Sequence, residues 1–553
     1  MMNGLTHQRP LRRARAWLAL PLGAALAAAT PGLAQAQAST SLDACPARIP
    51  LLRIATVSGD ESYTSHPAES RFSSTHYARL AHLPLFGVDP LESKIDPAYG
   101  VAESWTYLPG ATGMLVKIKK GLTFNDGSPL TVEDVVFSIE ATASKFADTQ
   151  ISGTLRGIGI KAKVIDGATV EIAFSQGSPT FDLEMSPMVF PLYITSKAYH
   201  SNGEISQEAF DKFRANPLAG GPYRIVGRQT QQFITLEAAR KDPLLGCPVY
   251  NRIEIRNVPE TATRMNQLRT GQQDIITGSR ELVDQAKRAG ATVATRADAN
   301  VIGFYFFHTD KPENVFNKED VRKAAAYAID HKLLGETIFG GVGLQSWGCT
   351  WPPPTEISIQ NPRYKKACGT PYPYDPAKSK ALLAAAGYGP GKGPNIKLEY
   401  SMSYPEEAAL AEAMEPMLKA VGFNVQIERT DLAERNRRRM AGLHANSILF
   451  FGPGGRVTAL AGVHSVYGPT QGWGPKHDPD VVAAIERASR AGSLDDYTNA
   501  IADVGELVHG RAYGPGFFSS GALFFLRKGI PDWGVGNSVG RGPLNLAGLA
   551  TKR

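Results

Sequence analysis

The stretch GLTFNDGSPLTVEDVVFSIEAT (121–142) places three carboxylates within nine positions, beside a glycine-containing turn. Asp126 belongs to an Asp-Gly turn dipeptide, so a local role explains it. Asp134 follows Thr131 by three residues, and apolar residues then recur at the spacing of one helical face. The pattern predicts that Thr131 caps a helix and that Asp134 satisfies backbone donors at its start. These acids therefore indicate scaffold rather than a metal or catalytic site.

The first 38 residues predict a secretory signal peptide. Four arginines precede an apolar run (16–29) that is too short to span a bilayer, and AQAQA (34–38) supplies small residues for cleavage after Ala36 or Ala38. The pair Arg12-Arg13 leaves the twin-arginine route open beside the general secretory route. We therefore expect export as a soluble protein to the periplasm.

Length and charge limit the classes of function. The chain has 553 residues, 43% of them hydrophobic and 20% charged, which allows two to four domains. The net charge of +7 falls to +7 − 4 = +3 without the four leader arginines. This charge is too small to indicate a nucleic-acid partner. The one dense basic cluster, RNRRRM (435–440), fits a solvated helix face better than a partner patch. No run after the leader reaches the ~18 apolar residues of a membrane helix.

Four cysteines remain in the exported chain: Cys45, Cys247, Cys349 and Cys368. An even count in an oxidising compartment predicts disulfides, and four cysteines allow three pairings. We favour Cys349–Cys368, which closes a short loop, and this leaves Cys45–Cys247 as the second bridge. No C-x-x-C spacing occurs, which argues against zinc binding or thiol redox chemistry.

Periodic patterns along the chain predict alternating helices and strands. Pro416 lies inside one helical pattern and should kink it or displace its start. Nearly continuous apolar runs predict strands buried on both faces, and helices between such strands predict a parallel α/β sheet. We expect a helix capped at Asn317–Asp320 in the same way as at Thr131–Asp134, a helix from Asp375-Pro376, and helices over 405–421, 479–491 and 495–509. We expect strands over 115–119, 164–174 (a hairpin), 233–239, 301–307 and 447–451.

Motifs for catalysis are weak. The string GNSVG (536–540) fits the nucleophile elbow G-x-S-x-G, but neither an acid nor a histidine follows it, which argues against a serine hydrolase built on Ser538. The histidines show no metal-ligand spacing, and we expect no cofactor. FGPGGR (451–456) follows an apolar strand. It fits either a glycine nest with Arg456 for an anionic group or a flexible turn with an exposed arginine.

Several separated segments resemble the family 5 extracellular solute-binding proteins of ABC importers, which include peptide- and nickel-binding members. The resemblance covers roughly residues 50–550 in family order. Its segments are VAESW (101–105), KGLTFNDGSPLTVEDVVFSIE (120–140), AGGPYRIV (219–226), ITLEAARKDPLLG (234–246), PETATRMNQLRTGQQDI (259–275) with Gly271 and Asp274, and EDVRKAAAYAIDHKLL (319–334).

The resemblance implies a two-lobed α/β periplasmic binding protein fold of type II, similar to cluster C. It implies lobe I over 39–300 with an inserted subdomain at about 73–214, lobe II over 301–515, and a C-terminal return to lobe I over 516–553. The chain would cross between lobes near Ala299–Phe304 and Pro515–Gly521. The family also implies a small solute, an ABC permease with its ATPase as partners, a monomer, and no catalysis.

Three segments should face the solute by this resemblance: 71–77, 400–407 and 450–456. In peptide-binding members the segment matching 450–456 supplies an aspartate for the ligand's amino terminus, and here it contains no acid. A peptide or peptide-like solute is the family's default. The departure favours an anionic, aromatic or sugar-like one, and a nickel or metal chelate is the other alternative. The candidate residues are Ser74, Thr75, His76, Tyr404, Phe451, Gly454, Gly455, Arg456 and Trp473.

Overall fold

The structure is a computed structural model, and it describes the chain from residue 40 to residue 550 with gaps. For some residues inside helices and strands it describes the backbone alone. The residues outside the description are 1–39, 57–63, 70–74, 93, 148, 176, 231, 340–344, 350–360, 401–405, 432–433, 436, 439–440, 452–458, 469–477, 515, 535–545 and 551–553.

Helices and strands alternate through most of the described chain. The α-helices are α1 (Thr75–Ala81), α2 (Val132–Ala143), α3 (Gln150–Gly157), α4 (Phe181–Glu184), α5 (Gln207–Ala215), α6 (Thr261–Arg269), α7 (Val283–Arg288), α8 (Glu319–Ala328), α9 (His331–Phe339), α10 (Pro362–Cys368), α11 (Pro376–Ala385), α12 (Glu406–Val421), α14 (Ala459–Tyr467), α15 (Pro479–Ser489) and α16 (Leu494–Gly510). The strands are β1 (Ile49–Thr56), β2 (Leu83–Pro84), β3 (Ala102–Tyr107), β4 (Gly113–Ile118), β5 (Lys161–Asp166), β6 (Thr169–Ala173), β7 (Tyr193–Ile194), β8 (Tyr223–Gln229), β9 (Phe233–Ala238), β10 (Tyr250–Asn257), β11 (Ile275–Thr277), β12 (Thr292–Phe306), β13 (Gln345–Trp347), β14 (Asn395–Tyr400), β15 (Asn424–Arg429), β16 (Ser447–Phe451) and β17 (Gly516–Leu526).

The acidic stretch is scaffold, as its sequence predicts. Thr131 caps α2, and its hydroxyl accepts a hydrogen bond from the backbone N–H of Asp134. The Asp134 carboxylate accepts in return from the Thr131 N–H at 2.8 Å and from the Lys197 N–H at 2.7 Å. The carboxylate therefore holds two backbone segments together and is not available to a metal ion.

Removing the cap is expected to weaken the fold modestly. Thr131→Ala should lower the free energy of unfolding by about 1 kcal/mol, because one backbone donor at the start of α2 loses its acceptor. Glu133→Ala changes an exposed carboxylate in the same turn and should have little effect. Urea unfolding monitored by circular dichroism measures both. A loss from Glu133→Ala as large as that from Thr131→Ala would contradict the capping role.

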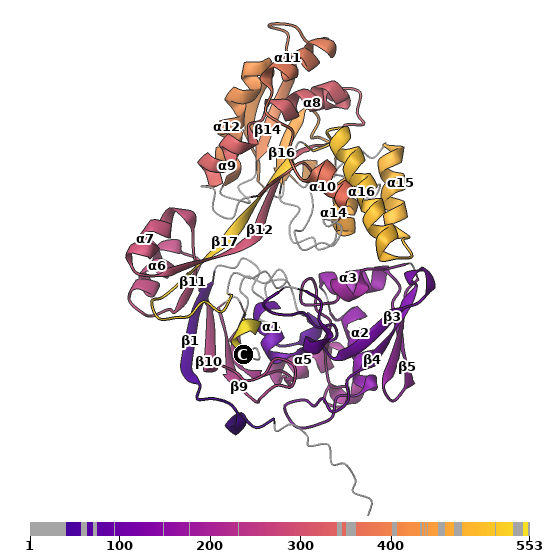
Figure 1. The fold of residues 1–553 in the computed structure, drawn as a ribbon, viewed down its shortest axis with the longest axis vertical. Helices are drawn as coiled ribbons and strands as arrows, with labels where there is room; N and C mark the ends of the chain where they lie inside the picture. The colour runs from indigo at the N-terminus through magenta and orange to yellow at the C-terminus, as the bar shows by residue number, and fades with distance from the viewer. Residues whose placement is uncertain are drawn as a thin grey trace, which may run out of the picture. The chain divides into compact units, whose positions relative to one another are not determined.

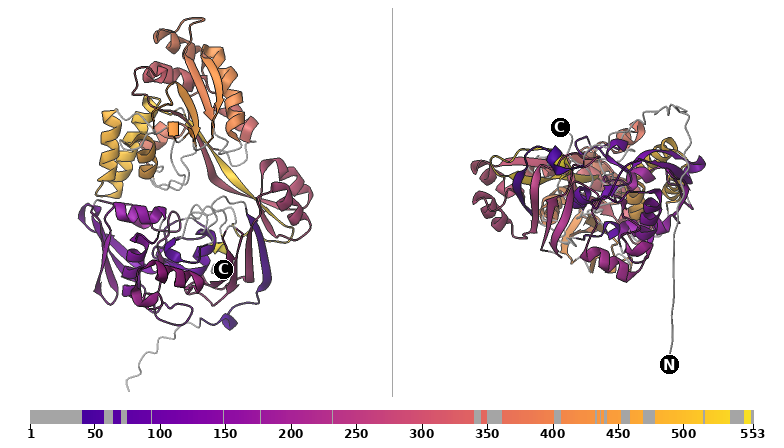
Figure 2. Two further views of the ribbon diagram at one scale, coloured as in Figure 1. Left: turned by 180° about the vertical axis from the view of Figure 1, so that it is seen from behind. Right: turned by 90° about the horizontal axis from the view of Figure 1, so that it is seen from below.

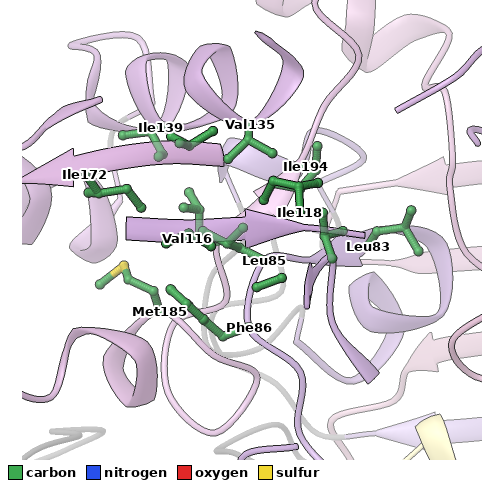
Figure 3. Packing of buried hydrophobic residues seen from close by; sticks show 14 of the residues in the cluster. Leu83, Leu85, Phe86, Val116, Ile118, Val135, Ile139, Ile172, Met185 and Ile194 are labelled. Atoms are coloured by element: carbon green, nitrogen blue, oxygen red, sulfur yellow. The ribbon is translucent and has the colours of Figure 1, made fainter. Parts of the chain in front are cut away.

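A small antiparallel sheet packs beneath α2. Its strand order is β3-β4-β6-β5, and β5 and β6 form the predicted hairpin. Figure 3 shows how Val116 and Ile118 of β4, Ile172 of β6, and Val135 and Ile139 of α2 meet in one apolar cluster. The alternation of apolar residues along the strands and their helical spacing along α2 both point into this core.

The large sheet joins eleven of the described strands. Its order is β15-β14-β16-β12-β17-β11-β1-β10-β9-β8, and β13 pairs with β17. Within it, β14 pairs in parallel with β15 and β16, and β1 pairs in parallel with β10 and β11. The prediction of parallel strands is therefore right for these two groups. It is wrong for β12, which runs antiparallel to both of its neighbours, β16 and β17.

Strands β12 and β17 connect the two parallel groups. They pair from Thr292↔Leu526 to Phe304↔Gly516, with a register shift between Arg296 and Asn300. Figure 1 shows the two strands side by side, and the view from behind in Figure 2 agrees. The predicted crossing Ala299–Phe304 lies in β12, and residues 516–521 of the other predicted crossing lie in β17; Pro515 is outside the described residues. Most of the apolar run at 301–307 therefore belongs to β12, which has an antiparallel neighbour on each edge and is not a parallel core strand.

The helix predictions hold with one correction. Asp375 caps α11 through its side chain, and α12 runs as one helix through Pro416. Asn317 does not cap α8: its backbone belongs to a short 3-10 turn, and Lys318 occupies the cap position without a side-chain hydrogen bond. The Asn317 side chain donates instead to the main-chain oxygen of Thr309, a contact distant in sequence. Among the described residues, no helix is both long and apolar enough to cross a membrane.

Both favoured disulfides form. Cys45 bonds Cys247, and Cys349 bonds Cys368. The first bridge ties the start of the described chain to the loop before β10. The second joins the segment after β13 to the end of α10, against Gly505 of α16, where a Cβ would lie 2.8 Å from the Cys368 sulfur. The first bridge lies beside the paired strands β1 and β10, and the second beside a backbone hydrogen bond from Gly348 to Cys368, so each reinforces an existing contact.

Candidate functional site

The candidate site lies at one edge of the large sheet, where β14 and β16 end. These neighbouring strands run parallel, with Leu398 opposite Ile448 and Glu399 opposite Leu449. They therefore lead at the same edge into segments 401–405 and 452–458. In open α/β sheets, ligands bind beyond the carboxyl ends of the strands. The topology thus brings together the starts of two of the three segments that the sequence assigns to the solute.

The structure describes only a few of the predicted site residues. Only the backbones of Thr75, His76 and Phe451 are described: the first two begin α1, and Phe451 ends β16. The remaining candidates lie outside the described residues, as does the serine of the hydrolase motif: Ser74, Tyr404, Gly454, Gly455, Arg456, Trp473 and Ser538.

The crossing strands border the same edge. Phe451 pairs with Gly303 of β12, and Gly303 pairs on its other side with Phe517 of β17. A Cβ on Gly303 would lie 2.6 Å from the ring of Tyr305, closer than real Cβ contacts allow. Glycine at this position therefore lets the Tyr305 ring lie against the strand where β16 meets the crossing pair.

A buried polar network lies directly beneath the edge. Glu399 of β14 accepts a hydrogen bond from Nδ1 of His444 at 3.0 Å and another from the hydroxyl of Ser447, at the start of β16. Burial alone would raise the pKa of Glu399, but the hydrogen bonds from His444 and Ser447 outweigh it and hold this pKa below its ordinary value. The carboxylate therefore stays ionised and links the two strands that lead into the candidate site.

Arginines extend this network. The side chain of Arg435 is buried and donates to the main-chain oxygen of Phe450 at 3.3 Å, one residue before β16 ends. Arg438 pairs with Glu428 of β15 at 2.6 Å, and Arg437 with Glu434 at 2.7 Å. The interpretation of this basic cluster as a solvated helix face is thus wrong for Arg435. Arg435 and Arg438 thus support the sheet edge, whereas Arg437 is exposed and pairs only within its own turn.

A second contact anchors β13 beside the crossing pair. Ser346 of β13 lies 3.3 Å from Nδ1 of His331, and the His331 ring packs against Phe304 and Phe518. Gly516 adopts a φ of +127°, and a Cβ there would lie 2.5 Å from the main-chain oxygen of Trp347. The close approach of β13 to β17 therefore depends on that glycine.

In the part of the chain that the structure describes, this arrangement positions segments at the sheet edge. The Glu399 network is a set of charges paired with protein groups, which stabilises strand ends rather than activating a nucleophile. Within the described ranges, no three His, Cys, Asp or Glu side chains gather as metal ligands would. The contacts to a bound molecule would come from the segments beyond the strand ends.

Sequence reasoning missed the supporting network. Glu399 and His444 are 45 residues apart, and neither lies in a recognisable motif. The sequence offered no signal for it. Glu399 lies in the alternating run NIKLEY (395–400), where it shares a strand face with Lys397. Such alternation predicts a solvent-facing carboxylate, so its burial could not be read from the sequence.

Comparison with protein families identifies the chain's relatives. Residues 96–454 match the family described as bacterial extracellular solute-binding proteins, family 5 Middle. The glutathione-binding protein GsiB of Escherichia coli strain K12 is 25% identical over 368 residues. The GsiB of Shigella flexneri gives the same identity over the same length. In each case the match covers 65% of this chain and 65% of the relative, just under two thirds of the relative's length.

Solved structures share the fold over most of the chain. The substrate-binding protein CtaP of Listeria monocytogenes superposes with a TM-score of 0.75 at 18% identity, covering 91% of this chain and 99% of CtaP. HbpA2 of Haemophilus parasuis superposes with a TM-score of 0.71 at 20% identity, covering 86% of this chain and 96% of HbpA2. DppA of Helicobacter pylori, in complex with the peptide STSA, superposes with a TM-score of 0.64 at 21% identity. The match covers 90% of this chain and 98% of DppA. At such identities the likeness establishes the fold, a two-lobed α/β binding protein. The family match extends over more than half of the chain, so the chain belongs to the bacterial extracellular solute-binding proteins of family 5.

Proposed function

We propose that this protein is the periplasmic solute-binding component of an ABC importer. One observation carries the proposal: the family match runs to residue 454 and includes the edge where β14 and β16 end together. The protein captures a small solute there and delivers it to a membrane permease. Other subunits hydrolyse ATP, and this chain makes or breaks no covalent bond in the solute.

The proposed domain boundaries follow the crossing strands. Lobe I covers 39–300 with a subdomain at about 73–214, lobe II covers 301–515, and residues 516–553 return to lobe I. The pairing of β12 with β17 supports this division. A solute that contacts both lobes favours the closed arrangement by its differential affinity, which couples capture to delivery.

We propose that the solute is small and peptide-like and carries an anionic group. The relatives named as glutathione-binding and the DppA complex with STSA support a peptide-like solute. The absence of an acid in 450–456 argues against a free amino terminus as the main anchor. Arg456 supplies the charge for the anionic group.

The signal peptide over 1–38 delivers the protein to the periplasm, where it acts as a monomer.

A melting-temperature screen tests this proposal. The panel is glutathione, the peptide STSA, N-acetylated STSA, mannopinic acid and nickel-histidine. A bound solute at 100 times its Kd should add about 2.7 kcal/mol of stability and raise the Tm by several degrees. We expect glutathione or the acetylated peptide to stabilise the protein more than unmodified STSA.

Variants at two arginines locate the binding. Arg456→Ala should weaken the best solute at least tenfold, whereas Arg437→Ala, an exposed arginine of the same lobe, should leave affinity within twofold. Stabilisation by nickel-histidine alone would contradict a peptide-like solute. Turnover of the bound solute by the purified protein would contradict the whole proposal.

A further inference from the structure

The free edge of the large sheet lines a cavity far in sequence from the candidate solute site. Strand β8 is the last strand of the sheet and pairs only with β9. A groove of about 910 Å³ runs along it, and we call this the β8 groove. One wall is residues 224–230 and the other is residues 214–219 with Asn125 and Tyr199.

The backbone of β8 is unpaired on the groove side. Among the described residues, the main chain of 224–228 makes no hydrogen bond beyond its pairing with β9. Such an edge is a template for one further strand. Peptides that add to an exposed edge gain main-chain hydrogen bonds along their whole length.

Asn125 on the opposite wall is a second, independent sign of a missing partner. Its backbone N–H donates to the Ala219 oxygen at 2.9 Å, which holds it on that wall. Both polar atoms of its side chain, Oδ1 and Nδ2, are shielded from solvent and make no hydrogen bond in the described part of the chain. A buried amide without partners costs free energy. A peptide group satisfies both atoms at once, since it offers one N–H and one C=O.

Charge defines the class of peptide. The lining includes Arg214, Arg224 and Arg228 against a single acid, Asp126. Arg214 is committed to Glu69 at 3.0 Å. Arg224 makes only an exposed contact of 3.4 Å with Glu237, which is weak, and Arg228 has no ion pair among the described residues. Two guanidinium groups therefore remain available to an incoming strand.

These two arginines lie on opposite faces of the sheet edge. The bulge between Ile225 and Gly227 places Arg224 opposite Glu237 and Arg228 opposite Ile234. Residues directly opposite each other on paired strands share a face of the sheet. Ile234 and Glu237 are three residues apart on β9, so they point to opposite faces, and Arg228 and Arg224 do the same. An added strand therefore meets an arginine on each of its faces.

A second copy of this chain does not fit the groove. Antiparallel pairing of two β8 strands about Val226 would set Arg224 of each copy against Arg228 of the other. Like charges directly opposed across a strand pair are destabilising. Charged residues on an edge also deter aggregation, but that role leaves the buried amide of Asn125 unexplained.

We propose that the β8 groove binds an extended, acidic segment of another protein, which adds as a strand to β8. The segment spans about seven residues, the length of β8. Its main chain pairs with 224–228 and with the Asn125 amide, and its carboxylates meet Arg224 and Arg228. This docking site is independent of the proposed solute site.

The probe is the heptapeptide VEEVEEV, which carries carboxylates on both faces of an extended strand. Fluorescein is attached to its amino terminus and its carboxyl terminus is amidated, so that it offers no free terminus. Anisotropy should show binding that weakens at least tenfold when alternate peptide nitrogens on the pairing edge are methylated. The peptide VKKVKKV should not bind. Equal binding of the methylated peptide would reveal simple charge attraction and overturn the proposal, as would no binding of VEEVEEV.

Variants and hydrogen exchange locate the site. Arg228→Glu should weaken VEEVEEV at least tenfold and Asn125→Leu at least threefold. Arg256→Glu, which changes an exposed arginine of the interior strand β10, should stay within twofold. In the wild-type protein, the peptide should slow exchange at 224–228 and leave 446–451 unchanged. Protection at 446–451 instead, or an equal loss from Arg256→Glu, would overturn the proposal.

Discussion

Replacing Glu399 by alanine is expected to lower the free energy of unfolding by about 3–5 kcal/mol, the loss seen when one partner of a buried ion pair is removed. The Glu399 side chain is 1% exposed. Its partner His444 is fully buried, and both of its ring nitrogens face acceptors at 3.0 Å, Glu399 and the main-chain oxygen of Arg435. Nδ1 of His444 donates to the carboxylate, and Nη1 of Arg438 lies 3.6 Å from the same carboxylate. The substitution removes the acceptor of both groups.

Urea unfolding measures the effect of Glu399→Ala. The control is Glu415→Ala, which removes an exposed carboxylate paired with Lys419 one turn along α12 and should cost at most about 1 kcal/mol. Because Glu399 immediately precedes the end of β14, the variant should also weaken the best solute of the melting screen. A loss equal to that of the Glu415 control would contradict the role of the network.

Acidification from pH 7 to pH 5 is expected to destabilise the folded protein. Three histidines, His66, His82 and His200, have 1–3% of their surface exposed. Burial lowers the pKa of each, and that of His82 falls from 6.5 to about 4. The unfolded chain therefore binds protons below pH 6.5 that the folded protein does not, so stability falls as the pH falls. His82 alone accounts for about 3 kcal/mol between pH 6.5 and 4.

The geometry of His66 and His200 explains why neither ring accepts a second proton. The N–H of Ala68 donates to Nδ1 of His66 at 3.1 Å, so the His66 proton lies on Nε2. That nitrogen lies 2.9 Å from Nε2 of His200, which must accept. Nδ1 of His200 donates to the main-chain oxygen of Glu204 at 3.0 Å. Every ring nitrogen is thus engaged in a chain that only two neutral rings can form.

Unfolding measured at several pH values checks the acid effect. His82→Gln keeps a donor but does not titrate, so its stability should depend less steeply on pH between 6.5 and 5 than that of the wild type. Burial raises the pKa values of Glu69, Asp134 and Asp242, so these carboxyls bind protons more readily in the folded protein than in the unfolded chain. This opposes the histidine effect at the acid end of the range. A flat wild-type profile between pH 7 and 5 would contradict the prediction.

Local patterns in the sequence were sufficient for much of the fold. The Thr131 cap, the β5–β6 hairpin and the starts of α11 and α12 depend on neighbouring residues, whose spacing the sequence displays directly. The disulfide pairs were also predictable, since four cysteines leave few choices. The Asn317 cap failed because a contact with Thr309 competes for that side chain.

The candidate site was predictable only in part. Segments near 400 and 451 could be assigned by resemblance, and the parallel pairing of β14 with β16 places their starts at one edge. The support of that edge could not be predicted, because Glu399, Arg435 and His444 are distant in sequence and each has many possible partners.

The sequence by itself determined the local elements, the disulfides and the family, because caps, turns and periodic apolar faces are short-range and family motifs keep their order along the chain. Only the tertiary structure decided which strands pair antiparallel, which charges are buried together and which edge stays open. Those outcomes depend on strand order and burial, which join residues such as Glu399 and His444, or Asn125 and β8, across long stretches of chain. No spacing rule along the sequence contains that information.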